Sequence, residues 1–540
     1  MTRPSQRLVS GVASGLTSAR VLAGSGIIRP FSPAKLAKLA LLVRAWGIGP
    51  AGGFATVAVR YPDRAGVVDE LGTLSFGEIH RRSNALARAL RHRGVSEGDA
   101  VAVMCRNHRG FVDASLAVAK LGADVIYLNT AFAGPQLVDV LARERAGTVV
   151  YDEEFADLLA GADVGDRILA WTDGAAADAG LPTLESLIAS APDHDLEAPD
   201  RRSRTVILTS GTTGAPKGAP RSDAGSDAAV AILSRLPLRE GWTTHIAAPL
   251  FHTWGYAHLA FAMLLGSTVV LTRKFDPETC LQITQDFACE SLVVIPVMLQ
   301  RIMQLPEETL ASYDLTCVRA VAASGSALPG DLATTWMDHF GDTLYNVYGS
   351  TEVAYASIAT PADLREAPGS AGKPPHGTVV KILDHAGHEL PRGESGRIFV
   401  GNGLLFDGYT GGGGKEVIDG LMSTGDVGRF DTAGHLYVEG RDDEMIVSGG
   451  ENVFPKEVED CLSRHAGVVE AAAIGVHDAD YGQRLRAFVV TTEEVAEDEL
   501  RDWVKRHLAR FKVPRDFVFV HELPRNATGK VVKRDLRERP

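Results

Sequence analysis

The chain has 540 residues and a mass of 57.5 kDa, which is enough for several folded units and a large buried core. Hydrophobic residues make up 45% and charged residues 23%, which excludes disorder, collagen and coiled coil as descriptions of the whole chain. The net charge of −13 argues against a general nucleic-acid binder. The five cysteines are scattered, with no Cys/His cluster, and predict neither a disulfide framework nor a zinc site.

The N-terminal segment is basic, because Asp63 is the first acidic residue of the chain. Residues 33–44 predict a basic amphipathic helix. Three interpretations stay open: a helix packed on the protein's own surface, a helix attached loosely to anionic lipid, and a cleaved transit peptide. No run of about 18 apolar residues predicts a transmembrane helix, and the last three residues are not a peroxisomal signal. We expect a cytoplasmic protein and leave open a peripheral contact with the inner face of the cell membrane.

The body of the chain predicts short apolar strands that alternate with helical stretches. In chain order, we expect a strand at 101–104, a helix at 111–121, and strands at 124–128, 205–208, 268–271, 291–295 and 318–321. This alternation is typical of parallel sheets with crossover helices.

Near residue 440 the sequence becomes polar and glycine-led. The tail beyond it predicts helices at 458–462 and 500–508 and strands at 468–476, 487–491 and 517–520. We therefore predict an α/β protein: a large N-terminal domain of parallel-rich sheets with crossover helices, plus a small mobile α+β C-terminal domain. The predicted divisions are a basic segment at 1–60, a large domain at 61–442 and a small domain at 443–540.

The strongest motif is Thr-Ser-Gly-Thr-Thr-Gly-Ala-Pro-Lys-Gly at 209–218, directly after the strand at 205–208. Glycines let a backbone approach phosphate closely, and hydroxyls and a lysine add donors and charge. A Walker A loop does not fit, because Pro216 precedes the lysine and Gly218 replaces the hydroxyl that would hold magnesium. A flexible surface turn is the alternative, and the density of hydroxyls and glycines disfavours it.

This loop resembles the signature phosphate loop of the adenylate-forming superfamily, which includes acyl-CoA synthetases, luciferases and peptide-synthetase adenylation domains. Further motifs follow in the order of that superfamily: Tyr-Gly-Ser-Thr-Glu at 348–352, Ser-Thr-Gly-Asp at 423–426, Gly-Arg-Asp-Asp at 440–443, Ser-Gly-Gly-Glu-Asn at 448–452 and Pro-Arg-Asn-Ala-Thr-Gly-Lys at 524–530. The resemblance runs from about residue 62 to 533 and is greatest to bacterial fatty-acid–CoA ligases.

The resemblance implies a reaction in which a carboxylate attacks the α-phosphate of ATP and expels pyrophosphate. Both reactants are anionic, so catalysis requires positioning and charge neutralisation. Lys530 would bridge the carboxylate and the α-phosphate, Thr351 would donate to that phosphate, and Glu352 would hold Mg²⁺. A helix N-terminus is the alternative interpretation of the Thr351–Glu352 pair.

The resemblance also assigns the remaining nucleotide and CoA contacts. Gly325, Ser326 and Ala327 would form the adenine turn, with Asn346 and Tyr348 beside the base. Asp426 and Arg441 would contact the ribose. Asp443 would be the hinge about which the small domain rotates, and Ser448, Gly449 and Gly450 would line the CoA tunnel. The expected nucleotide-binding residues are Thr209, Ser210, Gly211, Thr212, Thr213, Gly214, Lys217, Gly325, Ser326, Ala327, Asn346, Tyr348, Gly349, Thr351, Asp426 and Arg441.

The acid pocket maps to Pro-Leu-Phe-His-Thr-Trp-Gly at 249–255. His252 would position or gate the carboxylate, and Trp254 resembles the aromatic gate of fatty-acyl members; an ordinary core tryptophan is the alternative. No aspartate lies between 241 and 263 to pair with an ammonium group, which argues against an amino acid substrate. One departure from many relatives is the absence of a Ser/Thr-His pair at 220–227.

These observations predict a ligase that uses ATP, Mg²⁺ and CoA to activate a medium- or long-chain fatty acid through an acyl-adenylate. Only twenty residues separate Glu352 from Lys373, so the insertion of carrier-loading relatives is not evident and CoA is the favoured acceptor. The alternatives are a fatty acyl-AMP ligase that loads a carrier protein, a ligase for another acid, and a non-catalytic nucleotide or acyl binder of the same fold. A homodimer is left open.

Overall fold

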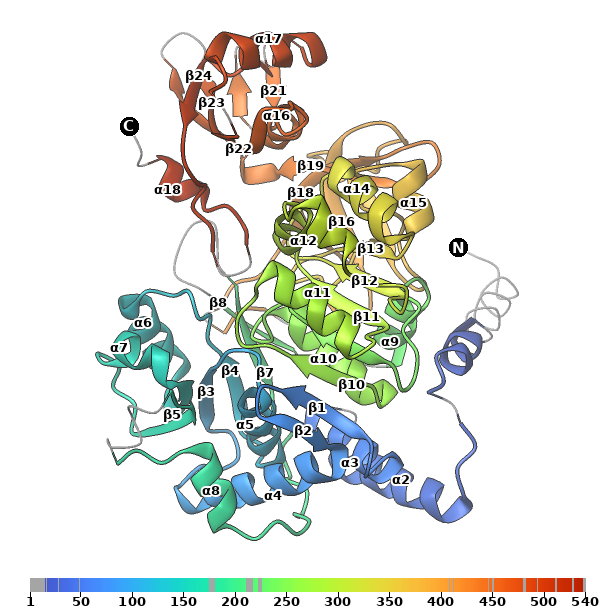
Figure 1. The fold of residues 1–540 in the computed structure, drawn as a ribbon, viewed down its shortest axis with the longest axis vertical. Helices are drawn as coiled ribbons and strands as arrows, with labels where there is room; N and C mark the ends of the chain where they lie inside the picture. Colours follow the sequence, from blue (N-terminus) through green and yellow to red (C-terminus); the bar gives the residue numbers. More distant parts are fainter. Residues whose placement is uncertain are drawn as a thin grey trace.

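The computed structural model describes residues 15–537 except 16, 28, 48, 174–179, 210–216, 222–225, 407, 411, 445, 449, 450, 479–481, 493, 510, 511, 527 and 528. At 209, 217–221, 226, 443, 447, 448, 451, 452 and 482 it describes the backbone alone. Figure 1 shows a large body built from the blue-to-yellow part of the chain and a small red domain at one end.

An eight-stranded sheet forms the centre of the large domain, in the order β14-β13-β12-β11-β9-β10-β1-β2. Its strands are β1 (Ala65–Asp69), β2 (Gly72–Ser75), β9 (Thr243–Ile246), β10 (Thr268–Leu271), β11 (Ser291–Val294), β12 (Ala320–Ala323), β13 (Leu344–Tyr348) and β14 (Ser357–Ala359). The six inner strands are parallel, and the two edge strands are antiparallel. This arrangement places the carboxyl ends of β9, β11, β12 and β13 along one edge.

A second sheet has six strands in the order β6-β5-β3-β4-β7-β8, parallel except for the β7–β8 pair. The strands are β3 (Ala100–Met104), β4 (Asp124–Tyr127), β5 (Ala146–Asp152), β6 (Asp166–Trp171), β7 (Thr205–Thr209) and β8 (Lys217–Arg221). The strands from β3 to β7 are mainly apolar where side chains are described, because helices cover both faces of such a sheet.

Helices surround these two sheets. They are α2 (Pro33–Trp46), α3 (Pro50–Arg60), α4 (Phe76–His92), α5 (Arg109–Lys120), α6 (Gly134–Glu144), α7 (Ala156–Leu159), α8 (Leu184–Ser190), α9 (Ser226–Leu233), α10 (Thr253–Leu265), α11 (Pro277–Asp286), α12 (Pro296–Met303), α13 (Glu307–Ala311), α14 (Gly330–Phe340) and α15 (Pro361–Glu366). Phe54 of α3, Phe76 of α4 and Phe111 of α5 are buried in the main core between the sheets. None of the described helices is both long enough and apolar enough to cross a bilayer.

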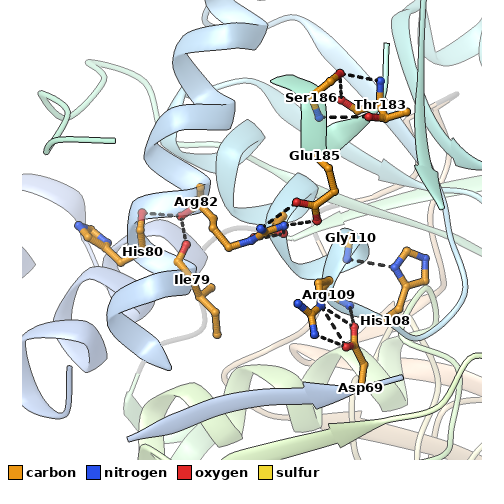
Figure 2. A network of polar contacts seen from close by, with 12 residues as sticks. Asp69, Ile79, His80, Arg82, His108, Arg109, Gly110, Thr183, Glu185 and Ser186 are labelled. Atoms are coloured by element: carbon orange, nitrogen blue, oxygen red, sulfur yellow. Dashed lines mark hydrogen bonds and ion pairs between the residues drawn. The ribbon is translucent and has the colours of Figure 1, made fainter. Parts of the chain in front are cut away.

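Ion pairs fix α4 and α5 to their neighbours (Figure 2). The Nε of Arg109, at the start of α5, donates to Asp69 at the end of β1 over 3.0 Å. Arg82 of α4 pairs with buried Asp113 of α5 at 2.8 Å and also with Glu185 of α8. Because α5 follows β3, the Arg109–Asp69 pair joins the second sheet to the eight-stranded one.

The rest of the chain forms two smaller sheets. An antiparallel sheet contains β15 (Val379–Leu383), β16 (Gly396–Gly401), β17 (Val417–Ile418), β18 (Leu421–Phe430) and β19 (Leu436–Arg441). The small domain contains β20 (Ile446–Ser448), β21 (Glu451–Val453), β22 (Val468–Asp478), β23 (Gly482–Thr491) and β24 (Asp516–Phe519), with α16 (Pro455–Leu462), α17 (Glu497–His507) and α18 (Lys533–Arg537). The predicted fold class is therefore confirmed, with a large parallel-rich domain and a small α+β domain.

The predicted elements differ from the observed ones mainly at their ends. The strand predicted at 318–321 is β12, which begins two residues later, because Val318 and Arg319 lie before the parallel pairing with β11 and β13 starts. Sequence periodicity locates an apolar run, but the partner strand decides where its ladder begins.

Candidate active site

The predicted site gathers at the carboxyl end of β11, where the chain enters α12. The indole nitrogen of Trp254 donates to Val294 O over 3.1 Å. A methyl group on Gly325 would lie 3.4 Å from Ile295, and one on Gly529 would lie 2.3 Å from Val297. The tryptophan of the predicted acid pocket, the predicted adenine turn and the C-terminal lysine loop therefore all lie against the short segment 294–297.

Tyr348, Asp426 and Arg441 form a polar cluster between the central sheet and the antiparallel sheet. The Tyr348 hydroxyl donates to Asp426 over 2.6 Å, and an Arg441 guanidinium nitrogen lies 3.3 Å from the other carboxylate oxygen. Asp426 and Arg441 are register partners on β18 and β19. Burial raises the pKa of Asp426, while Arg441, Tyr348 and Lys530 act in the opposite direction. Tyr348 and Arg441 orient the Asp426 carboxylate, which can accept hydrogen bonds from the hydroxyl groups of a ligand.

Glu352 is a second, half-buried carboxylate near this cluster. It accepts a 2.7 Å hydrogen bond from the Tyr409 hydroxyl. Burial acts to raise the pKa of Glu352, but Tyr409, Ser350 and the charge of Lys415 lower it overall. Glu352 is therefore anionic at neutral pH.

A tight turn presents Thr351 and Glu352. A methyl group on Gly349 would lie 2.2 Å from the carbonyl oxygen of Ala354, so no side chain fits at position 349. Ala354 has a φ of 62°, in the left-handed region that residues with a side chain rarely adopt. Residues 351–353 form a turn, so the alternative of a helix beginning at Thr351–Glu352 is wrong.

The C-terminal lysine loop reaches the large domain. Asn526 holds the loop by a hydrogen bond from its N–H to Lys530 O and by accepting one at Oδ1 from Lys530 N, both 2.9 Å. Gly529 has a φ of 74° and packs on Ile295 and Val297, as described above. A further contact joins the domains, because Gln300 donates to Val469 O over 3.2 Å. Lys530 is exposed and lies close enough to Asp426 to lower its pKa.

The predicted adenine site combines an open turn with a buried acceptor. Ser324 donates to Val347 O over 2.7 Å, which ties the turn after β12 to β13. Gly325 and Ala327 are exposed in this turn, and Gly325 has a φ of 99°. The Oδ1 atom of Asn346 is buried and has no hydrogen-bond partner in the part of the chain that the structure describes. A buried acceptor without a partner is costly unless a ligand supplies the donor.

The segment before α10 carries the two predicted acid-pocket residues. Asn107 holds this segment through bonds to Ile246 O, Ala248 O and Leu250 N. Burial lowers the pKa of His252 to about 3, so its imidazole is neutral at physiological pH. Trp254 packs edge-on against His258 at 4.4 Å between ring centroids, and Trp254 also packs against two clusters of core residues. One side of the Trp254 ring therefore packs on the core, and the half-buried position is compatible with both interpretations, a gate of the acid pocket and a core tryptophan.

Comparison with known proteins gives the family. Residues 54–410 match the AMP-binding enzyme family, and residues 457–530 match the AMP-binding enzyme C-terminal domain. The chain belongs to the AMP-binding enzyme family. The resemblance to adenylate-forming enzymes that the motifs carry is thereby confirmed.

The chain is similar to members of this family whose names give different acid substrates and different acceptors. It is 33% identical to a feruloyl-CoA synthase of Amycolatopsis sp, over 86% of this chain and 94% of that one. It is 29% identical to the fatty acid–[acyl-carrier-protein] ligase ScoC of Streptomyces coeruleorubidus, over 88% and 94%. Among solved structures, the anthranilate CoA ligase AuaEII in complex with anthranoyl-AMP matches with a TM-score of 0.81 and 25% identity, covering 90% of this chain and 96% of that one.

Part of the family's motifs falls outside what the structure describes. Ser210, Gly211, Thr212, Thr213, Gly214, Gly449 and Gly450 lie outside the described residues. The ends of their loops are described: Thr209 and Lys217 are register partners on β7 and β8. Asp443 lies in a short 3₁₀ helix, η3 (Asp442–Glu444), and Ser448 ends β20.

Tyr409 and Lys415 are candidate site residues that the sequence reasoning missed. A methyl group on Gly425, in the Ser-Thr-Gly-Asp motif, would lie 3.1 Å from Lys415 Nζ and 3.2 Å from an Arg441 nitrogen. Lys415 forms no ion pair with any described carboxylate. The available signal was the glycine run at 411–414 before Lys415.

Magnesium, which the family resemblance implies, fits Glu352. The carboxylate is anionic, and oxygen is the ligand atom that this hard cation prefers. One protein carboxylate is sufficient, because magnesium commonly takes its other ligands from water and substrate phosphates.

A separate cluster brings Cys105, His108 and Asp152 within 4.8 Å of one another, contrary to the expectation of no Cys/His cluster. Both nitrogens of His108 already have partners: Nδ1 accepts from Gly110 N at 3.0 Å, and Nε2 lies 2.8 Å from Asp152. Burial raises the pKa of the Cys105 thiol. These bonds cap α5 and serve the fold.

Proposed function

We propose that the chain is an AMP-forming acid–CoA ligase that works in two half-reactions. In the first, a carboxylate oxygen attacks the α-phosphorus of ATP, the bond to the β-phosphate breaks, and pyrophosphate leaves. In the second, the sulfur of CoA attacks the acyl carbonyl and AMP leaves, while the thiol proton goes to solvent. The observation that carries this proposal is the Lys530 loop, which packs on the β11–α12 junction with its charge acting on Asp426.

In the first half-reaction, Lys530 would neutralise the charge between the acid and the α-phosphate, and Thr351 would donate to that phosphate. Asp426 would accept from the ribose hydroxyls, with Tyr348 and Arg441 orienting its carboxylate. Asn346 Oδ1 would accept from the adenine amino group, which would supply the donor that this buried atom lacks. Positioned charges and donors of this kind account for most catalysis of phosphoryl and adenylyl transfer.

Glu352 would hold magnesium, which neutralises phosphate charge when bound. Tyr409 fixes the orientation of this carboxylate. Lys415 adds a cation on the same side of Gly425 as Arg441, which favours binding of the anionic nucleotide.

The second half-reaction would require the small domain to move. We propose the boundaries 1–60, 61–442 and 443–540, with Asp443 as the pivot. The helix α3 of the first segment packs into the core of the large domain. The end of the basic segment is therefore part of the folded large domain and not a flexible extension of it. After rotation, Ser448, Gly449 and Gly450 would line the path of the CoA thiol, where small residues allow close approach.

For the acid, we propose a medium- or long-chain fatty acid. The pocket segment supports an acid whose acyl group is apolar and carries no further charge, because His252 is neutral and no acidic residue lies between 241 and 263. An aromatic acid is the second candidate, supported by the similarity to feruloyl-CoA synthase and anthranilate CoA ligase.

Two further alternatives concern the acceptor and the chemistry. The similarity to the carrier-protein ligase supports transfer to an acyl carrier protein in place of CoA. A non-catalytic binder of the same fold would be insensitive to Lys530→Ala in ligand uptake. The retention of Lys217, Glu352, Asp426 and Lys530 supports an enzyme instead.

The test is an assay with ATP, Mg²⁺ and acids from C2 to C18, together with benzoate and ferulate. Pyrophosphate release and thioester formation are followed separately, with and without CoA. We expect pyrophosphate and thioester with fatty acids of medium or long chain. Thioester with ferulate alone would establish the aromatic alternative, and adenylate that accumulates in the presence of CoA would indicate a carrier protein. No pyrophosphate with any of these acids would contradict the proposed reaction.

A further inference from the structure

The helix α2 packs on the large domain through one narrow face. Lys35, Leu39, Leu42 and Trp46 follow each other at spacings of four, three and four, which puts them on one side of a helix. Lys35 Nζ donates to Arg60 O over 2.7 Å. Trp46 is buried and packs, with Leu42, in one apolar cluster.

The rest of α2 is exposed and almost entirely apolar. Leu41 is 68% exposed, Leu36 48% and Val43 41%, and these are three of the ten large hydrophobic residues exposed in the described part of the chain. The only charged residues on this face are Lys38 and Arg44. The exposed positions of the helix are Pro33, Ala34, Leu36, Ala37, Lys38, Ala40, Leu41, Val43, Arg44 and Ala45.

This composition is not that of a helix face in contact with water. A surface helix normally carries charged and polar residues on its outer side, and a helix that is apolar all round is normally covered. On α2 the outer face has apolar side chains, two cations and no acid. Whatever covers this face must therefore accept both apolar groups and positive charge.

Charge complementarity selects an anionic lipid surface. The chain carries −13 overall but has no acid before Asp63, so the basic segment is a local exception. Leucine, valine and alanine side chains can enter the acyl boundary of a bilayer while lysine and arginine meet anionic headgroups. A second copy fits less well, because a two-fold contact would bring the Lys38 and Arg44 side chains of both copies together.

We propose that the outer face of α2 binds the enzyme to the surface of an anionic bilayer. In Figure 1, α2 lies at the lower edge of the molecule, at the opposite end from the small domain. Binding through this face leaves the small domain free in water. The proposal does not depend on which acid or acceptor the enzyme uses.

The test is sedimentation of the full chain with vesicles of phosphatidylcholine alone or with about 30% phosphatidylglycerol. We expect binding only to the anionic vesicles, weakening with salt as surface charges are screened. Leu41→Glu is expected to lower the partition coefficient at least about tenfold, because it puts an acid among apolar side chains. The double variant Lys38→Gln/Arg44→Gln is expected to lower it about 25-fold, from about fivefold per cation removed.

Leu71→Glu is the matched control, since Leu71 is 57% exposed at the β1–β2 turn and does not belong to α2. It should bind vesicles as the unchanged protein does. Ligase activity on a water-soluble acid should be unchanged in all three variants, which reports that they fold. Equal binding to neutral and anionic vesicles, or unchanged binding by Leu41→Glu, would overturn the proposal. A dimer that Leu41→Glu dissociates, with no vesicle binding, would overturn it in favour of a second copy.

Discussion

Lys530 is an exposed residue of the small domain, whereas Asp426, whose pKa its charge lowers, belongs to the large domain. Its contribution is local charge, and its position depends on Asn526 and on the contact of Gly529 with Val297. The motif at 524–530 could be identified from sequence alone. Its proximity to Asp426 could not, because more than a hundred residues separate the two along the chain.

We predict that Lys530→Ala lowers acyl-adenylate formation by about a hundred- to a thousandfold, the loss typical of removing one positioned group that stabilises developing charge. Pyrophosphate–ATP exchange measures this half-reaction. Thioester formation from added acyl-adenylate and CoA should change little, because the lysine is proposed to act before that step. Lys505→Ala, which removes an exposed lysine of α17, is the control and should leave both reactions unchanged. Equal losses in both half-reactions would contradict the assigned role.

At the same scale, Tyr409 and Lys415 show a limit of motif reading. Both belong to the segment that connects β16 to β17. The Tyr409 side chain reaches Glu352, and the Lys415 side chain reaches Gly425. No spacing rule links position 409 to 352, because the hydrogen bond depends on how Phe406 and Tyr409 lie against the turn. Asn346 is the opposite case, since its place beside the base was expected and its acceptor is buried without a described partner.

At the scale of elements, the turn after β13 determines where Glu352 lies. Gly349 is required there by close approach, because its position has no room for a methyl group beside Ala354 O. Sequence alone identified the motif but not this contact. Each of the nine strands predicted from apolar runs lies on a strand of the structure, but these are fewer than half of the 24 strands in the described part of the chain. Their ends shifted where a neighbouring strand decided the pairing, as at β12.

We predict that Gly349→Ala lowers the free energy of unfolding by about 2–3 kcal/mol and abolishes most adenylation, because the turn must open to admit the methyl group. Chemical denaturation and pyrophosphate release measure the two effects. Gly147→Ala in β5 is the matched control, since no atom lies within 4 Å of the added methyl group. A Gly349→Ala enzyme with unchanged stability and activity would show that the turn is not constrained as described.

At the scale of the whole molecule, acid should destabilise the fold well before the carboxylates titrate. Burial lowers the pKa of His245 to about 4 and those of His252 and His258 to about 3, from an ordinary value of 6.5. The unfolded chain therefore binds more protons below pH 6.5, and stability is lost as pH falls from 6.5 toward these lower values. Each histidine contributes up to about 1.4 kcal/mol per pH unit in this range.

Chemical denaturation at pH 7 and pH 5 measures this loss. We expect a lower free energy of unfolding at pH 5, and a smaller difference between the two pH values when His258 is replaced by glutamine. His388→Gln changes an exposed histidine and should leave the difference as it is. Equal stability at both pH values would contradict the neutral state of the three rings.

The relative position of the two domains yields another prediction. Proline fixes φ, so Asp443→Pro should hinder rotation at the proposed pivot. We expect pyrophosphate–ATP exchange to persist while thioester formation falls by at least about tenfold, because only the second half-reaction needs the other arrangement. Asp443→Ala keeps backbone freedom and should retain both reactions. Loss of pyrophosphate–ATP exchange in Asp443→Pro would contradict this role, because it would show that position 443 is needed for the domain arrangement of the first half-reaction.

The sequence by itself determined the fold class, the family and the order of the motifs. These follow from short-range patterns: apolar runs, glycines at close approaches, and hydroxyls and a lysine after a buried strand. The tertiary structure decided which of those residues meet. Tyr348 reaches Asp426, Trp254 reaches Val294 O, and the Lys530 loop reaches the β11–α12 junction, because two sheets and a small domain pack together. Such contacts depend on packing over long chain separations, which no local pattern of residues encodes.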